Sequence, residues 1–183
     1  MPKVAIVLAD GFEEVEAIAP IDALRRADIE VLIAGLSKEP VISARGVRIL
    51  PDVSVDELNP DELDMIVLPG GAVGVENLKK DKRVEALVKA LEEKGKYVSA
   101  ICAAPTALAS FGILKGKRAT VYPSLSKYIE PATFVEERVV EDGKIITSQG
   151  PGTALLFALK LVERLAGKDK AREVAQKMLI DWE

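Results

Sequence analysis

The sequence predicts a single α/β domain in which a mostly parallel β-sheet carries helices on both faces. Short apolar runs rich in Val, Ile and Leu alternate with longer amphipathic segments along the 183 residues. The first strand, helix and second strand fit within about thirty residues, the size of a βαβ unit, which requires parallel strands. A chain of this length is enough for one domain with a substantial core, and no repeat or linker divides the sequence.

The predicted strands of the sheet are short apolar runs that end at breaking residues. Apolar and β-branched residues fill each run, as in strands that are buried on both faces. Asp10-Gly11 ends the first run, Pro69-Gly70-Gly71 ends another, and Pro123 ends the last. We expect these strands at residues 3–9, 29–35, 65–68, 97–101 and 119–122.

Apolar positions at helical spacing predict the helices between the strands. Residues 77–94 are expected to form one long helix with an apolar face, capped by Gly95. Pro20 lacks an N–H, so we expect it to restart or kink the first helix. We expect helices at 13–27, 77–94, 103–110 and 169–179, and another that Gly150-Pro151-Gly152-Thr153 opens and that runs to Leu165.

Three segments are expected to lie outside the regular strand–helix alternation. Residues 41–51 alternate polar and apolar side chains and predict a small hairpin that turns at Arg45-Gly46. Residues 134–147 predict a second hairpin, with its turn at Glu141-Asp142-Gly143. Residues 52–64 are acidic and interrupted by proline, which predicts a short helical turn and a loop.

The composition excludes several kinds of catalytic site. The chain has no histidine and one cysteine. Ser-His-Asp and Cys-His catalysis are therefore absent, and a zinc site is not expected. Proton transfer must fall to carboxyl, phenol, amine or thiol groups. Lys and Glu are abundant and Asn and Gln scarce, a balance typical of thermophilic or idealised sequences.

The composition also bears on partners and location. The net charge is −4 with both signs mixed along the chain, which argues against nucleic acid as the main partner. No signal peptide is evident, and the longest uncharged stretch, residues 65–75, is too short to span a bilayer. A single cysteine cannot form an internal disulfide. We therefore expect a cytoplasmic protein without a membrane partner.

Cys102 is the first candidate catalytic residue because it lies between a predicted strand and a predicted helix. Such elbows present nucleophiles in several enzyme classes. The N-terminus of the helix is expected to stabilise a thiolate and to lower the pKa of the thiol. The alternative is a small buried apolar residue, which is what most free cysteines are.

Two other strand ends are expected to meet Cys102 at the carboxyl edge of the sheet. Glu16 falls after the first turn of its helix, where a buried carboxyl group has a raised pKa and can shuttle a proton. Gly70 and Gly71 permit backbone N–H groups to approach a ligand and to form an oxyanion hole. The alternatives are ordinary ones: acidic residues that complement a helix dipole, and a Gly-Gly turn.

Four motifs in order resemble the ThiJ/PfpI superfamily, in particular the branch of the parkinsonism-associated protein deglycase and bacterial YajL. They are KVAIVLADGFEEVEA from Lys3, VLPGG from Val67, AICAAPTALA from Ala100 and TSQGPGT from Thr147, and they cover essentially the whole chain. The resemblance implies a flavodoxin-like three-layer sandwich with a small hairpin, a homodimer, and no metal or organic cofactor.

The resemblance also implies roles for site residues. Cys102 would be the oxidation-sensitive nucleophile and Glu16 the protonated carboxyl group at its sulfur. Gly70, Gly71 and the N–H of Ala103 would surround the reacting oxygen, and Arg45 would lie near the dimer contact. Two departures stand out. Ala103 occupies the place of the histidine found in members called peptidases, and Tyr122 replaces a histidine of the parkinsonism-associated protein, where its hydroxyl is still able to bind substrate.

Cys102, Glu16 and the family resemblance together predict an enzyme that converts small dicarbonyl aldehydes to hydroxy acids, or that removes early glycation adducts from protein side chains. Both activities need only a thiol and a carboxyl group. The alternative function is a redox sensor or oxidative-stress chaperone in which Cys102 is oxidised to a sulfinate. An intracellular cysteine peptidase is the least favoured function, because the histidine is missing.

Overall fold

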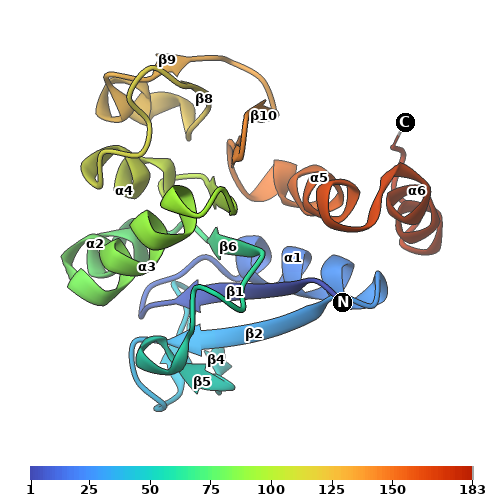
Figure 1. Cartoon of the computed structure of the whole chain (residues 1–183), viewed down its shortest axis with the longest axis horizontal. Coiled ribbons are helices and arrows are strands. Elements are labelled where there is room, and N and C mark those ends of the chain that lie inside the picture. Colours follow the sequence, from blue (N-terminus) through green and yellow to red (C-terminus); the bar gives the residue numbers. More distant parts are fainter. Residues whose placement is uncertain (183) are drawn as a thin grey trace.

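The computed structural model describes residues 1–182, and its centre is a seven-stranded sheet with helices on both faces (Figure 1). The strands are β1 (Lys3–Leu8), β2 (Glu30–Gly35), β3 (Val41–Ile42), β4 (Arg48–Ile49), β5 (Val53–Ser54), β6 (Met65–Leu68), β7 (Tyr97–Ile101), β8 (Arg118–Ala119), β9 (Thr133–Phe134), β10 (Val139–Asp142) and β11 (Ile145–Ser148). The α-helices are α1 (Glu14–Arg26), α2 (Ala72–Lys80), α3 (Lys82–Glu93), α4 (Pro105–Ser110), α5 (Ala154–Ala166) and α6 (Lys168–Lys177). Short 3-10 helices span Val55–Glu57, Pro123–Ile129 and Pro151–Thr153.

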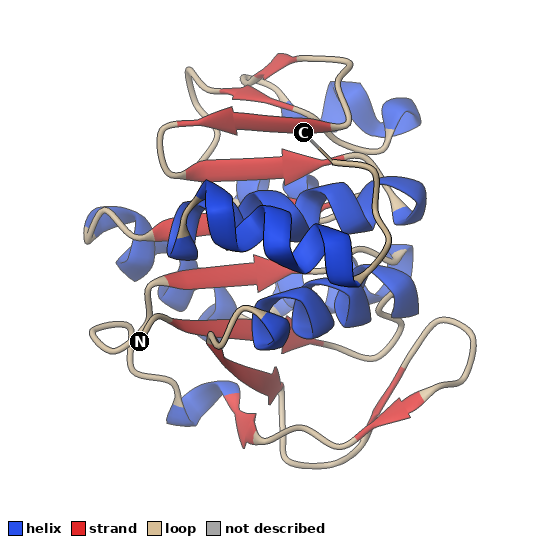
Figure 2. Cartoon of the chain, turned by 90° about the vertical axis from the view of Figure 1, so that its right-hand side faces the viewer, coloured by secondary structure: helices blue, strands red, loops and turns tan. Residues whose placement is uncertain are grey.

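The sheet has the strand order β10-β11-β7-β6-β1-β2-β5, and only β10 runs antiparallel to its neighbour. One apolar core lies between the sheet and α1, α5 and α6, and a second lies between the sheet and α2, α3 and α4. Figure 2 shows these helices in front of and behind the strands. The predicted α/β class and the three-layer sandwich are therefore confirmed. No helix within residues 1–182 has the length and apolarity that crossing a bilayer requires.

The topology places the site at the carboxyl edge of the sheet. The chain leaves β1 toward β2 and β5, and then returns to β6 on the other side of β1. Ligands of open α/β sheets bind where the strand order reverses in this way. The segments that follow β1, β6 and β7 meet at this point, and they contain Glu16, the Gly70-Gly71 pair and Cys102.

The predicted long helix over residues 77–94 is wrong, because the structure has two helices, α2 and α3. Asp81 between them is extended, and its side chain accepts a hydrogen bond from the N–H of Arg83 at 2.9 Å. Asp81 therefore caps the second helix instead of continuing the first. Conversely, α1 runs through Pro20 without the expected restart.

The first predicted hairpin is confirmed and the second only in part. β3 and β4 pair antiparallel around the turn at Arg45-Gly46. β10 and β11 form the hairpin at Gly143, but Phe134 belongs to β9, which pairs in parallel with β8. β8 ends at Ala119, so the predicted strand does not reach Tyr122. The sequence reasoning also missed β5, which adds an edge strand beside β2.

Candidate active site

Cys102 lies directly after β7 in a backbone conformation that residues other than glycine rarely adopt, with φ of +63°. Backbone hydrogen bonds to both the N–H and the carbonyl group of Cys102 hold this conformation. The N–H of Cys102 donates to the carbonyl of Ser148 at 3.0 Å, and the N–H of Tyr122 donates to the carbonyl of Cys102 at 2.9 Å. Such strain is typical of functional positions and requires support from neighbouring structure. The elbow thus presents the Cys102 side chain at the edge of the sheet.

Two backbone N–H groups, those of Gly71 and Ala103, face the sulfur of Cys102 and lower the pKa of its thiol. The helix after Cys102 begins only at Pro105 and is six residues long. The donors near the sulfur are therefore these two N–H groups, and not the helix N-terminus that the sequence predicted. Gly71 has φ of +95°, and a Cβ atom there would lie 2.3 Å from the carbonyl oxygen of Gly11. Glycine is therefore required at this position for its N–H to face the sulfur.

Glu16 is completely buried in α1, next to Cys102. Its Oε2 accepts a hydrogen bond from the N–H of Gly70 at 2.7 Å. Its Oε1 is buried as well, and no donor among residues 1–182 satisfies it in distance and angle. The thiol of Cys102 is the adjacent donor that acts on the carboxyl group, although its alignment falls short of a regular hydrogen bond.

Gly70 is the point at which the three parts of the site converge. A Cβ atom at Gly70 would lie 2.4 Å from Oε2 of Glu16 and 2.6 Å from Cβ of Cys102. Both distances are shorter than atoms tolerate, so any side chain at Gly70 would push the carboxyl group and the thiol apart. The predicted Gly-Gly pair therefore has a steric role in addition to supplying N–H donors.

Burial raises the pKa of Glu16 from 4.5 to about 7. Burial and the adjacent Glu16 together raise the pKa of Cys102 to about 12, whereas the N–H groups of Ala103 and Gly71 lower it by less. The expected low thiol pKa is therefore wrong. Above about pH 7 the pair mostly holds one negative charge and one proton, because each charge opposes the other.

Tyr122 and Arg45 lie near this centre but are not parts of it. The backbone of Tyr122 is bonded to Cys102, while its half-exposed ring lies against Gly150. Within residues 1–182 its hydroxyl group makes no hydrogen bond. Arg45 is exposed at the hairpin turn, and its N–H donates to the carboxylate of Glu14. The hydroxyl contact to substrate and the position of Arg45 at a dimer contact remain predictions.

Sequence reasoning missed three supporting residues. Ser148 supplies the carbonyl that holds the N–H of Cys102, and Glu13 caps α1 by accepting from the N–H of Glu16 at 2.9 Å. Glu14 anchors the hairpin through Ser43 and Arg45. The acidic run before α1 contained a signal for the cap, because carboxylates favour helix N-termini. The carbonyl of Ser148 had no such signal.

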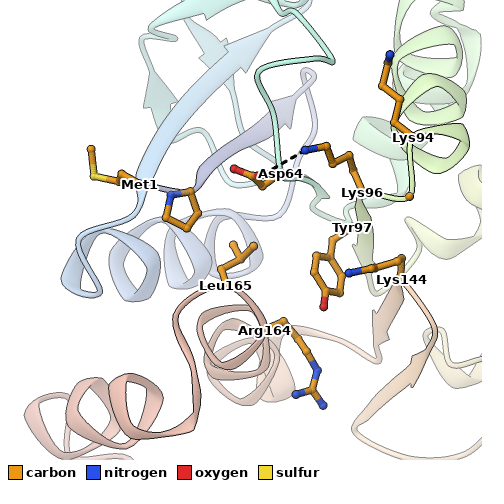
Figure 3. Close-up of a pocket in the computed structure, with 10 residues that line it drawn as sticks. Met1, Asp64, Lys94, Lys96, Tyr97, Lys144, Arg164 and Leu165 are labelled. Carbon is orange, nitrogen blue, oxygen red and sulfur yellow. Dashed lines mark hydrogen bonds and ion pairs between the residues drawn. The ribbon is translucent and has the colours of Figure 1, made fainter.

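A larger cavity of about 620 Å³ lies at the opposite, amino end of the strands (Figure 3). Its charged residues have partners within the chain. Lys96 pairs with Asp64 at 3.3 Å, Arg164 with Glu141, and the ammonium group of Lys144 lies 4.0 Å from the centre of the Tyr97 ring. The length of β7 separates this cavity, which contains Tyr97, from Cys102. We therefore do not assign a catalytic role to the cavity.

The buried Glu16 predicts that the free energy of unfolding falls as pH rises from 4.5 to 7. The folded chain keeps the Glu16 proton up to about pH 7, whereas the unfolded chain releases it near its ordinary value of 4.5. The folded state therefore binds more protons between these values, and increasing pH destabilises it, by about 3 kcal/mol at most.

Urea unfolding from pH 4 to pH 8 measures this effect. Glu16→Gln should lack this decline and gain stability relative to the wild type as pH rises. The exposed Glu39→Gln is the control and should keep the wild-type slope. Equal slopes for the wild type and Glu16→Gln would show that Glu16 does not hold a proton in the folded chain.

Comparisons with known proteins identify the family of this chain. The model of the DJ-1/PfpI family matches residues 2–164. Protein dj-1beta of Drosophila melanogaster is 46% identical over 180 residues, which cover 97% of this chain and 96% of the relative. Its crystal structure superposes with a TM-score of 0.96 at 44% identity, with 99% of each chain covered.

Two further relatives add names that bear on function. A Caenorhabditis elegans protein named glutathione-independent glyoxalase DJR-1.2 is 36% identical over 181 residues, 97% of each chain. The structure named Toxoplasma gondii DJ-1, oxidized, has a TM-score of 0.96 at 36% identity and full coverage of both chains. The family model and these identities show that the chain belongs to the DJ-1/PfpI family.

Proposed function

We propose that this protein is a glutathione-independent glyoxalase that converts methylglyoxal to lactate and glyoxal to glycolate. One observation is its main support: a fully buried carboxyl group with a raised pKa and an unpartnered oxygen lies beside a thiol that faces two backbone N–H donors. This arrangement supplies a nucleophile, a proton carrier and an oxyanion site. The related glyoxalase DJR-1.2 supports the same activity.

The first step forms a bond between the sulfur of Cys102 and the aldehyde carbon. Glu16, which has a pKa of about 7, accepts the thiol proton as the sulfur attacks, so the proton moves within the pair and the total charge is unchanged. The aldehyde oxygen becomes an oxyanion that the N–H groups of Gly71 and Ala103 are placed to receive. Glu16 then returns the proton to this oxygen and gives a hemithioacetal.

The second step moves hydrogen between the two substrate carbons. The Glu16 carboxylate removes the proton from the carbon bonded to sulfur and delivers it to the neighbouring ketone carbon, while the proton of the hemithioacetal hydroxyl passes to the former ketone oxygen. The product is a thioester of a hydroxy acid. Water then breaks the C–S bond and regenerates the thiol. One carbon is oxidised as the other is reduced, so the sum is one dicarbonyl and one water per hydroxy acid, with no external oxidant or cofactor.

The same steps extend to early glycation adducts of Cys, Lys and Arg side chains. An adduct of methylglyoxal with a thiol or amine carries the same two reacting carbons, and transfer to Cys102 would release the protein side chain. The elbow lies at the edge of the sheet, which favours access for a side chain presented on another protein. Deglycase activity is therefore a second use of one mechanism.

A redox or chaperone function is the second candidate, and the donors around the sulfur favour it. A sulfinate on Cys102 would accept hydrogen bonds from the N–H groups of Gly71 and Ala103, and a protonated Glu16 would donate a third. The relative from Toxoplasma gondii is named as oxidized. Peptidase activity has no such support, because Ala103 cannot act as a general base.

We also propose that two copies of this chain pair through α1. Val15 and Ile18 are about half exposed on α1, and Leu155 on α5 lies beside them in the same apolar groove. The β3–β4 hairpin, which carries Arg45, is tied to this end of α1 through Glu14. Burial of this groove by a second copy would remove exposed apolar surface and place Arg45 near the contact.

Light scattering on a sizing column tests this pairing. The wild type should elute as a dimer and Ile18→Lys as a monomer, because a buried ammonium group would oppose association. Val73→Lys, at an exposed apolar position on α2 outside this groove, is the control and should remain a dimer. A monomeric wild type, or an Ile18→Lys variant that remains a dimer, would contradict the proposal.

The glyoxalase proposal predicts lactate from methylglyoxal without glutathione for the wild type only. Cys102→Ala removes the nucleophile and Glu16→Gln removes the proton carrier, so each should lower turnover by about 10³-fold or more. Lactate is assayed as the product, and circular dichroism checks that each variant is folded. A Cys102→Ala protein with full turnover would rule out the mechanism. No lactate from the wild type would leave the redox function as the better account.

A further inference from the structure

An apolar pocket of about 300 Å³ lies beside the candidate active site, between α2, α4 and the 3-10 helix Pro123–Ile129. This volume is at the lower end of the range for small-molecule sites, about 300–1,000 Å³. Most of the lining side chains are apolar or aromatic. The lining residues are Ala72, Val75, Glu76, Lys79, Ala103, Thr106, Leu125 and Tyr128.

The pocket adjoins the two donors that face the sulfur of Cys102. Ala103 supplies one donor through its N–H and a wall of the pocket through its side chain. The other donor is the N–H of Gly71, and the next residue, Ala72, also lines the pocket. A substrate whose reacting oxygen lies between these two N–H groups therefore borders the pocket at Ala103, and on the Gly71 side it is one residue away from the pocket.

The charges of the lining favour a neutral occupant. Lys79 and Glu76 pair with each other at 3.1 Å, so they offer no unmatched charge to a ligand. The hydroxyl of Thr106 donates to the carbonyl of Ala103 at 2.7 Å and is also occupied. What remains is an apolar surface from Val75, Leu125 and the exposed ring of Tyr128. A ligand that covers this surface with a hydrocarbon group gains binding free energy, because apolar area is removed from water.

We propose that this pocket binds the substituent of a 2-oxoaldehyde and that it selects apolar, ring-sized substituents over a methyl group. This inference rests on the proposed glyoxalase function and adds the substrate class. The methyl group of methylglyoxal would leave most of the pocket unfilled, whereas a phenyl ring would contact its apolar walls and the ring of Tyr128. The chemistry at Cys102 and Glu16 is the same for both substrates.

The test compares kcat/KM for phenylglyoxal with kcat/KM for methylglyoxal. Tyr128→Ala removes one exposed wall and should lower the value for phenylglyoxal by about fivefold to tenfold, with less than about a twofold change for methylglyoxal. Ala72→Trp fills the pocket from an exposed position and should produce at least the same selective loss. Ser124→Ala is the control, because it is exposed on the same 3-10 segment but does not line the pocket.

Equal losses for both aldehydes, or no loss for phenylglyoxal in either pocket variant, would overturn the inference while leaving the glyoxalase function intact. If the wild type consumes neither aldehyde, the proposed function fails, and equilibrium binding of the hydroxy acids then decides the role of the pocket. Calorimetry should show tighter binding of mandelate than of lactate to the wild type, and Tyr128→Ala should remove the difference. Equal binding of mandelate and lactate would refute the apolar pocket as a ligand site.

Discussion

The contact between the buried Glu16 carboxyl group, the N–H of Gly70 and Cys102 is the constraint that organises this end of the molecule. It joins three strand ends that are far apart in sequence. Glycine is required at Gly70 because a Cβ atom would displace the carboxyl group, and at Gly71 because of its positive φ. The flanking elements therefore have little freedom: α1 must begin directly after its cap, Glu13, and a left-handed residue must follow β7.

This arrangement costs stability, and the rest of the fold compensates. A fully buried carboxyl group with one unpartnered oxygen is unfavourable, and so is the left-handed Cys102. Both are placed on strongly supported elements. β6 and β7 are almost entirely buried in the middle of the sheet, and the carbonyl of Ser148 and the N–H of Tyr122 fix Cys102 from two sides. Reactivity at the sheet edge thus depends on a rigid interior.

Much of the fold was predictable because its signals are local. Buried strands such as β1 and β6 are short apolar runs, and the hairpin at Arg45-Gly46 follows from alternation and a glycine turn. The break at Asp81 was missed because the apolar pattern continues across it, while the decisive event is a single side-chain cap. The pairing of β8 with β9 depends on long-range contacts, which periodicity does not encode.

The candidate site was predictable as a set of residues but not as an electrostatic environment. Strand ends identified Glu16, the glycine pair and Cys102. The helix after Cys102 suggested a lowered thiol pKa, yet burial and the adjacent carboxyl group raise it. The direction of the shift in the thiol pKa depends on which groups face each other across the sheet edge, and therefore on the tertiary structure. The pocket beside Ala103 likewise has no sequence signal, since three separate elements form it.

The central claim is that Cys102 bonds to the aldehyde carbon and that Glu16 performs the next proton transfer. NMR of Glu16→Gln with ¹³C-labelled methylglyoxal tests this claim most directly. Solvent water can carry the thiol proton in the slow addition step, but Glu16→Gln has no base for the transfer between the two carbons. We therefore predict a protein-bound hemithioacetal signal that forms slowly and accumulates in Glu16→Gln, and that is absent from the Glu16→Gln, Cys102→Ala double variant. Free hydrated aldehyde alone, or the same bound signal in both variants, would contradict the account.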